Sequence, residues 1–202
     1  MRREINLKKL NSYRASLAKY GVSPRALKWK TKEAALVRYR ELFWDLDIEG
    51  KSILDVGCGF GDIINFLKSK TNNFSYFGID LVPEFIEIAR RNHPEANFVI
   101  GDFFSYKFER SFDIVVCCGA LNSALENLES RFEAIKKMFS LASWALSFNM
   151  AGNHPQPLNK KGGRVYYVDS LEVLNFCFSL TSNLIFRHHY REKDFTIVMF
   201  KK

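Results

Sequence analysis

A run of alternating glycines, with one carboxylate before it and another about twenty residues after it, is the part of the sequence best suited to chemistry. An apolar strand pattern ends at Asp55, and Gly57, Gly59 and Gly61 follow it. Glycine suits a sharp turn there, because it tolerates positive φ angles and lets a ligand approach the backbone. Asp80 ends the next apolar segment, where a carboxylate can accept hydrogen bonds from ribose hydroxyls. The pattern predicts a nucleoside-binding site.

The charge around this loop favours a cationic ligand group over a phosphate. Dinucleotide-binding loops have the spacing G-x-G-x-x-G and hold a pyrophosphate at a helix N-terminus. Here the spacing is G-x-G-x-G, and Asp55 and Asp62 flank the loop. Two carboxylates attract an ammonium group and repel a diphosphate. The loop therefore suits a ligand that carries an ammonium group.

The elements that must position these residues alternate along the chain from residue 50. Short apolar segments are separated by amphipathic ones, which is typical of a mostly parallel sheet covered by helices on both faces. Such sheets bind ligands beyond the carboxyl ends of their strands. The last two apolar segments surround four polar residues and predict a closing antiparallel hairpin. The predicted strands are 52–56, 74–79, 97–100, 112–118, 144–150, 183–190 and 195–200.

Apolar residues at helical spacing predict the helices between these strands. One such stripe covers residues 60–67 and a second covers 82–89. The most regular stripe, within 125–139, has apolar residues three or four positions apart throughout. A further helix over 171–178 follows a long polar loop, 151–168.

Residues 1–49 have a different composition from the rest of the chain. They show a helical pattern with an interruption at Gly21–Pro24, so we divide the chain into an N-terminal helical cap segment (1–49) and a main domain (50–202). Residues 1–40 hold 12 Lys and Arg and 2 Asp and Glu, a net charge of +10, whereas residues 41–202 have a net charge of −2. This basic segment either attracts an anionic partner, such as nucleic acid, or forms a solvated helix face.

Four motifs, in this order, resemble those of class I S-adenosylmethionine-dependent methyltransferases. They are Asp55-Val-Gly-Cys-Gly-Phe-Gly-Asp62 (motif I), Gly78-Ile-Asp80 (ribose), Gly101-Asp102-Phe103 (adenine) and Phe112–Val116 (fourth strand). The resemblance extends over residues 50–150. It implies an α/β fold, namely a Rossmann-like three-layer sandwich with a seven-stranded, mostly parallel sheet, an antiparallel final strand and an N-terminal helical cap. It also implies S-adenosylmethionine as cofactor, S-adenosylhomocysteine as product, and no metal.

The resemblance further implies a role for each residue around the cofactor. Arg38, in a segment that would cap the pocket together with Trp29, would pair with the carboxylate of the methionine part. The other contacts would be made by Asp55 at the amino group, by Gly57, Cys58, Gly59 and Gly61 along the methionine part, by Asp80 at the ribose, by Leu81, Asp102 and Phe103 at the adenine, and by Cys118 and Gly119 beneath the sulfonium.

The acceptor side of the reaction has weaker signals. His154 is the candidate general base, because it lies in the polar loop 151–168 and imidazole titrates near neutral pH; a surface histidine is the alternative. The segment after the fourth strand lacks the Asn/Asp-Pro-Pro motif of adenine amino-group methyltransferases. It also lacks the Pro-Cys motif of cytosine-C5 enzymes, so we interpret Cys117 as a core residue.

The remaining features limit the class of protein. No pair of cysteines has the C-x-x-C spacing of a zinc or redox site, and we expect reduced thiols and no metal. We find no secretory signal and no apolar stretch that could span a bilayer, so we expect a cytoplasmic enzyme without a membrane partner. The favoured acceptor is a small molecule. The alternatives are methylation of RNA or protein through the basic segment, a cofactor-binding protein without catalysis, another nucleoside enzyme on this fold, and a nucleic-acid-binding module.

Overall fold

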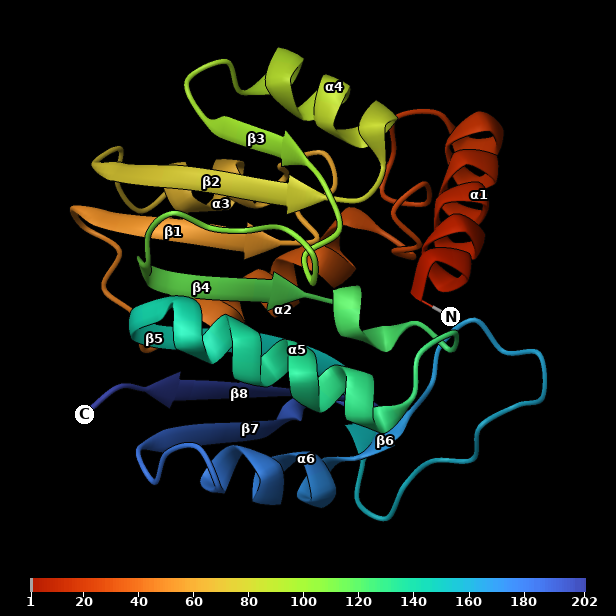
Figure 1. Ribbon diagram of the computed structural model, residues 1–202, viewed down its shortest axis with the longest axis vertical. Coiled ribbons are helices and arrows are strands. Elements are labelled where there is room, and N and C mark those ends of the chain that lie inside the picture. The colour runs from red at the N-terminus through yellow and green to blue at the C-terminus, as the bar shows by residue number, and fades with distance from the viewer. Residues whose placement is uncertain (1) are drawn as a thin grey trace.

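One mixed sheet forms the centre of the computed structural model, which describes residues 2–202 except for the side chain of His189 (Figure 1). Its strands follow the order β3-β2-β1-β4-β5-β8-β7, and a short β6 pairs with β5 outside this series. The strands are β1 (Lys51–Val56), β2 (Phe74–Asp80), β3 (Asn97–Ile100), β4 (Phe112–Cys118), β5 (Ala142–Asn153), β6 (Val168–Asp169), β7 (Leu184–Arg191) and β8 (Asp194–Phe200).

The pairing directions confirm the predicted mostly parallel sheet with an antiparallel last strand, and the short β6 adds an eighth strand to the seven predicted. Strands β1 to β5 pair in parallel, and β8 lies antiparallel between β5 and β7. The order of the strands reverses between β1 and β4: β2 and β3 follow β1 toward one edge of the sheet, and β5 follows β4 toward the other. In sheets of this kind the ligand binds at that reversal, beyond the carboxyl ends of the strands.

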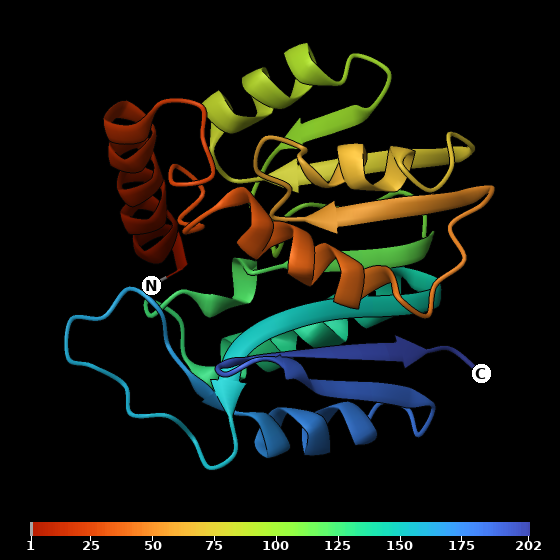
Figure 2. The ribbon, with the colours of Figure 1, turned by 180° about the vertical axis from the view of Figure 1, so that it is seen from behind.

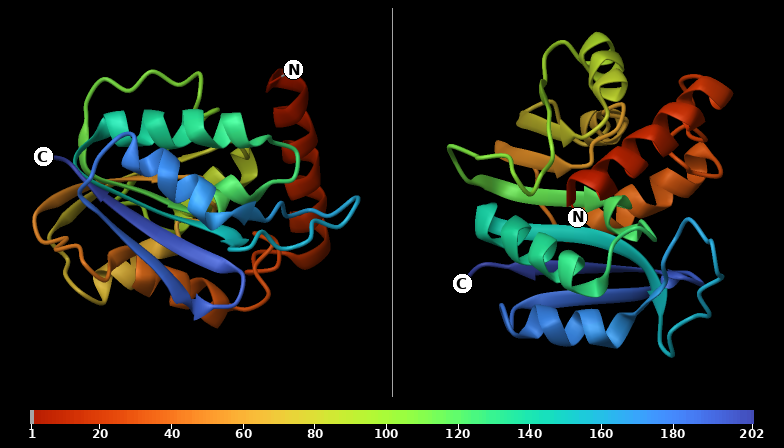
Figure 3. Two further views of the ribbon diagram at one scale, coloured as in Figure 1. Left: turned by 90° about the horizontal axis from the view of Figure 1, so that it is seen from below. Right: turned by 45° about the vertical axis from the view of Figure 1, so that its right-hand side comes forward.

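Helices cover both faces of the sheet and make the three predicted layers (Figure 3). Helices α2, α3 and α4 contribute to the core on one face, and α5 and α6 contribute to the core on the other. The apolar residues of the two stripes predicted within 60–67 and 82–89 are all buried, namely Phe60, Ile63, Ile64 and Leu67 in the first and Val82, Phe85, Ile86 and Ala89 in the second. The helices are α1 (Arg2–Tyr20), α2 (Lys32–Phe43), α3 (Ile63–Lys68), α4 (Pro83–Asn92), the 3₁₀ turn η1 (Ala120–Asn122), α5 (Leu128–Leu141) and α6 (Ser170–Phe178).

Two predicted helical stripes were wrong in detail. Helix α5 begins after Asn127, whose side chain accepts a hydrogen bond from the backbone N–H of Ser130 at 2.9 Å; this cap ends the preceding turn and leaves Leu125 outside the helix and 42% exposed. In α6 the buried face contains Val173 and Cys177, whereas Phe178 is 51% exposed. The face of a short helix depends on its neighbours, which apolar spacing alone does not specify.

Residues 2–49 occupy two different places in the fold. The chain leaves helix at Gly21, as the sequence predicted, and α1 then packs beside α4, where Tyr13 meets Phe85 edge to face at 5.6 Å. Helix α2 instead lies on the sheet, where the hydroxyl of Ser147 in β5 donates to the carbonyl oxygen of Leu42 at 2.7 Å (Figure 2). Within residues 2–202, no helix combines the length and apolar character needed to cross a membrane.

Candidate functional site

A cavity of about 890 Å³ lies at the carboxyl ends of the central strands. Its floor consists of the loops that follow β1, β2, β3 and β4, and its other walls come from α1, residues 25–30, α2 and the segments 164–167 and 191–194. The volume is near the upper end of the range for small-molecule sites. Segments that are far apart in the sequence therefore enclose a space large enough for more than one ligand.

Backbone conformation explains the glycines after β1. Gly57, Gly59 and Gly61 have φ angles of 78°, 56° and 75°, a region that other residues rarely adopt. A Cβ at Gly57 would lie 2.5 Å from the Cβ of Ala120, and one at Gly59 would lie 2.9 Å from Leu27. The loop is thus packed between η1 and the segment before α2, with no room for side chains.

Asp55 presents a buried acceptor atom to the cavity. The residue is 3% exposed, and its Oδ2 accepts a hydrogen bond from the hydroxyl of Tyr76 at 2.8 Å. Its Oδ1 is buried and has no partner among the described residues. Burial raises the pKa of Asp55 to about 7. An unpartnered buried carboxylate oxygen fits a ligand ammonium group, which would supply both the missing donor and the compensating charge.

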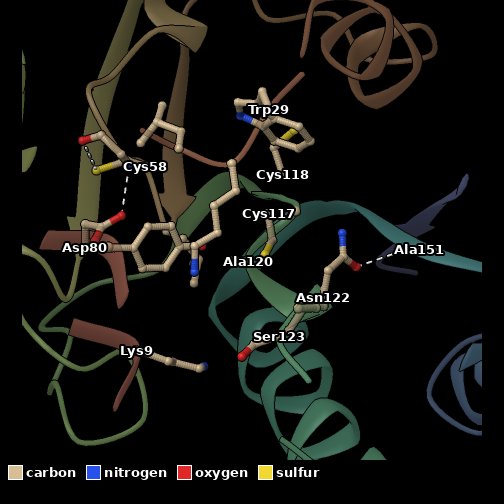
Figure 4. Close-up of a pocket in the computed structure, with 18 of the residues that line it drawn as sticks. Lys9, Trp29, Cys58, Asp80, Cys117, Cys118, Ala120, Asn122, Ser123 and Ala151 are labelled. Carbon is tan, nitrogen blue, oxygen red and sulfur yellow. Dashed lines mark hydrogen bonds between the residues drawn. The ribbon is translucent and has the colours of Figure 1, made fainter. Parts of the chain in front are cut away.

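Asp80 connects the first two loops of the site (Figure 4). Its Oδ2 accepts a hydrogen bond from the backbone N–H of Gly59, and its Oδ1 accepts one from that of Val82, both at 2.9 Å. Burial raises the pKa of this carboxyl, and the backbone donors oppose that shift. Each oxygen keeps a second acceptor position, so the carboxylate fits a pair of ribose hydroxyls.

The loop after β3 is held by a lysine from α5. The ammonium of Lys137 donates to the carbonyl oxygens of Phe103, Phe104 and Tyr106 at 2.6, 2.9 and 3.0 Å. Asp102, in the same loop, accepts a hydrogen bond from the hydroxyl of Ser105 at 3.1 Å. Asp102, Phe103 and Phe104 all line the cavity, together with Leu81 and Val82 on the opposite side.

The segment after β4 meets the N-terminal part of the chain. Gly119 has a φ angle of 77°, and a Cβ there would lie 2.6 Å from the ring of Trp29. Its backbone N–H donates to Oδ1 of Asn149 in β5 at 2.8 Å. Cys118 also lines the cavity, near Trp29 (Figure 4). Burial raises the pKa of Cys117 to about 12, which leaves its thiol protonated and inert at neutral pH.

Arg38 lies in the cavity wall, where its guanidinium stacks 4.7 Å from the ring centroid of Trp29. It forms an ion pair with Asp194 at the start of β8 and donates to the carbonyl oxygen of Ala34. Its Nε is buried and has no partner among the described residues. The residue is therefore fixed in place with one donor still unused, which fits an additional carboxylate.

His154 lies away from these residues. It does not line the cavity, its side chain is 54% exposed, and its Nδ1 is 3.1 Å from the carboxylate of Asp169. The structure thus separates the candidate base from the predicted cofactor site, and within residues 2–202 the cavity lining contains no histidine.

Sequence reasoning missed three residues that hold the loops of the site. They are Lys137 and Asn149, described above, and Arg131, whose guanidinium is fully buried. Arg131 donates to the carbonyl oxygens of residues 121, 123, 126 and 127 at 2.6–2.9 Å and so fixes the loop between η1 and α5. The sequence signal that could have found Arg131 is its position: it is a charged residue on the same helix face as the apolar stripe of α5.

Comparison with known proteins relates this geometry to a family. The profile of a methyltransferase domain matches residues 53–141. A provisionally named methyltransferase of Mycobacterium tuberculosis is 30% identical over 158 residues, which cover 74% of this chain and 93% of that protein. The chain spans less than half the length of several other curated relatives.

Solved structures share the fold at low sequence identity. A magnesium protoporphyrin IX methyltransferase from Synechocystis PCC 6803, crystallised with S-adenosylmethionine, superposes with a TM-score of 0.63 at 16% identity, over 84% of this chain and 79% of that one. The plantazolicin methyltransferase BpumL, in complex with a pentazolic desmethylPZN analog and S-adenosylhomocysteine, gives 0.67 at 14% identity, over 98% and 97%. Together with the Mycobacterium tuberculosis relative, which is 30% identical over most of both chains, these matches show that the chain belongs to the class I S-adenosylmethionine-dependent methyltransferases. It is an enzyme that uses S-adenosylmethionine.

Proposed function

We propose that this enzyme transfers the methyl group of S-adenosylmethionine to a small-molecule acceptor. The observation that carries the proposal is the enclosure of the cavity by α1, residues 25–30, residues 164–167 and residues 191–194. An acceptor that reaches the floor of this cavity has to pass between these segments and share the space with the cofactor. A small molecule meets that condition more readily than a folded RNA or protein.

The residues around the cavity support a specific placement of the cofactor. In this proposal Asp55 accepts from the ammonium, Arg38 binds the carboxylate, Asp80 binds the ribose and Asp102 accepts from the adenine amino group. The methionine part would lie along the backbone of the loop from Gly57 to Gly61. The side-chain roles use acceptors and a donor that the described residues leave available.

When bound, the cofactor would supply a methyl carbon attached to a positively charged sulfur. In the transfer, a lone pair of the acceptor forms a bond to this carbon while the carbon–sulfur bond breaks and leaves its electron pair on sulfur. This chain's own residues align the acceptor with that bond and exclude water. Leu121 and Asn122 lie at the cavity end of β4, the place where the acceptor would meet the methyl group. The side chain of Asn122 is fixed there because its Oδ1 accepts from the backbone N–H of Ala151 at 2.7 Å (Figure 4).

Several of the N-terminal cations are used within the protein, which favours a small molecule over nucleic acid. Lys9, Arg14 and Arg38 form ion pairs with Glu126, Glu84 and Asp194 of the main domain, so they are engaged in holding the N-terminal segment against that domain. A nucleic-acid surface needs cations that are available to phosphates. The two structural neighbours are named for a porphyrin and for plantazolicin as substrates, which also favours an acceptor smaller than a folded macromolecule.

The acceptor class can be tested by following the methyl group. The enzyme is incubated with methyl-labelled S-adenosylmethionine and a cell extract, and the products are separated by ultrafiltration. After chromatography has separated unreacted S-adenosylmethionine from the filtrate, we expect label in a low-molecular-weight product that is absent with the Asp80→Ala variant and without added enzyme. Label that stays with RNA or protein would contradict the proposal. In that case a steep loss of activity with added salt would identify phosphate contacts.

A further inference from the structure

The acceptor half of the cavity has an excess of positive charge. Apart from the charged groups assigned to the cofactor, the residues that line the cavity include seven cations and three carboxylates, Glu126, Glu192 and Asp194. These carboxylates already pair with Lys9, Arg38, Arg191 and Lys193. Within residues 2–202, four cations of the lining have no carboxylate within 4.0 Å, namely Arg25, Lys28, Lys30 and Arg164. Of these, Lys28 and Arg164 interact with each other.

Lys28 has an unusual backbone conformation at the cavity wall. Its φ angle of 65° makes it the one non-glycine residue with positive φ among those described, a conformation that costs free energy and is found preferentially at functional sites. Its ammonium lies 3.7 Å from the ring centroid of Tyr13 and 3.0 Å from the hydroxyl oxygen of Ser12. Two contacts with α1 thus hold this ammonium without neutralising it, and one of them, Tyr13, is itself part of the cavity lining.

Arg164 reaches the same region from a different part of the chain. Its carbonyl oxygen accepts from the backbone N–H of Ala124 at 3.1 Å, and the next residue, Val165, forms a β-bridge with Ser123. This pairing holds the long loop against the segment after η1. The guanidinium has no hydrogen-bond or ion-pair partner in the described part of the chain, so its five donors remain available.

The two cations are close enough to repel each other. The pKa of Lys28 is lowered first by burial and then by the positive charges of Arg164 and Lys9. Lys9 approaches from α1, on the side of the cavity where Ser123 projects (Figure 4), and its charge is balanced by Glu126 at 2.7 Å. Lys28 and Arg164 have no such balance, and an anion between them would remove the repulsion.

The site between Lys28 and Arg164 differs from the site proposed for the carboxylate of the cofactor. In the proposed placement that carboxylate lies at Arg38, against Trp29 and the start of β8. Lys28 and Arg164 instead contact α1 and the segment after η1, and S-adenosylmethionine has no second carboxylate. A second anionic group would therefore belong to the acceptor.

We infer that the methyl acceptor carries an anionic group, a carboxylate or a phosphate, which Lys28 and Arg164 bind at the junction of the N-terminal segment and the 164–167 loop. This inference rests on the proposed function, because it concerns the acceptor of that reaction. A guanidinium binds either anion with two parallel hydrogen bonds, and the lysine adds a point charge. The aromatic rings of Tyr13, Trp29 and Tyr167 in the same lining suit an acceptor with an apolar or aromatic body.

Calorimetric titration of the S-adenosylhomocysteine-saturated enzyme tests the inference with three probes of similar shape: benzoate, phenyl phosphate and the neutral benzamide. We expect at least one anion to bind tenfold or more tightly than benzamide, with an affinity that falls as salt is added. The Lys28→Met and Arg164→Gln variants should each weaken that binding about tenfold, or about 1.4 kcal/mol. The relative affinities of benzoate and phenyl phosphate distinguish the two anion classes.

A matched control removes the same charge from the same loop. Lys161 does not line the cavity, and Lys161→Gln should leave the affinity for the anionic probes within twofold of the original enzyme. Equal binding of benzamide and the anions, no binding of either anion, or full affinity in the Lys28→Met and Arg164→Gln variants would each overturn the inference. Binding of S-adenosylhomocysteine is measured first, because its failure would contradict the proposed function instead.

Discussion

At the scale of single residues, the buried carboxyl of Asp55 should make cofactor binding depend on pH. Its pKa is raised to about 7 by burial, and its carboxylate form is the one that can accept from an ammonium group. The affinity for S-adenosylhomocysteine should therefore rise about tenfold between pH 6 and pH 8 as this group ionises. Calorimetry at both pH values measures the change. The Asp55→Asn variant should bind more weakly and without this slope.

The same residue should have the opposite effect on the stability of the ligand-free protein. A carboxyl whose pKa is raised in the folded state stabilises the fold at low pH, and this contribution is lost as the pH rises from about 4 to about 7. A persistent pH slope of cofactor affinity in Asp55→Asn would assign the titration to another group.

Arg38 gives a second prediction at this scale. If it binds the methionine carboxylate, Arg38→Ala should weaken S-adenosylhomocysteine about tenfold or more, because a charge-assisted hydrogen bond is lost. The nucleoside 5′-methylthioadenosine lacks that carboxylate, so its affinity should stay within about threefold in the same variant. Titrations with both ligands separate a direct contact from damage to the cavity caused by leaving Asp194 with one partner fewer. Equal losses for both ligands would contradict the direct contact.

At the scale of elements, a helix on one face of the sheet positions a loop at its edge. Lys137 of α5 holds three carbonyl groups of the loop after β3, so Lys137→Met should lower the free energy of unfolding by about 2 kcal/mol and the melting temperature by about 4–8 °C. Hydrogen exchange at residues 103–106 should increase. Lys136→Met, at the exposed neighbouring position, is the control. Unchanged exchange in Lys137→Met would show that the loop holds its own conformation.

Arg131 shows why a helix in this position contains a buried cation. Its guanidinium donates to four carbonyl groups of the loop that precedes α5, and so links turns that are otherwise held by few backbone hydrogen bonds. A buried charge is costly unless its hydrogen bonds are satisfied, and here the carbonyl groups satisfy them. One element thus shapes the loop that brings Asn122 to the cavity.

At the scale of the whole molecule, ion pairs attach the basic N-terminal segment to the main domain. The basic N-terminal segment lies against acidic groups of the main domain, and Leu27 and Trp29 press on the glycines of two cofactor loops. In the proposed placement, the segment that covers the cofactor also contacts the loops that would hold it. Binding of the ligand and ordering of this segment should be coupled.

Limited trypsin digestion measures that coupling. Saturation with S-adenosylhomocysteine should slow cleavage after Arg25, Lys28 and Lys30 several-fold, because these sites line the occupied cavity. Cleavage after Lys160 and Lys161, which lie outside the lining, provides the internal reference and should change little. Equal rates with and without ligand at Arg25–Lys30 would mean that the segment does not respond to the cofactor.

The sequence by itself determined the order of strands and helices, the antiparallel hairpin at the end and the loop from Gly57 to Gly61. These depend on local causes: the period of apolar residues, the φ angles that glycine permits, and the spacing from that loop to Asp80. The resemblance to a family rested on the same local motifs and is confirmed by the 30% identical relative.

Only the tertiary structure decided how the rest of the cavity is built. Arg38 meets a partner 156 residues away, Lys137 holds a loop more than 30 residues before it, and Lys28 and Arg164 line one cavity from separate segments. His154, chosen for its residue type and loop, instead lies outside the lining beside Asp169. Contacts of this kind leave no periodic trace in the chain, because they depend on which surfaces packing brings together and not on the spacing of neighbouring residues.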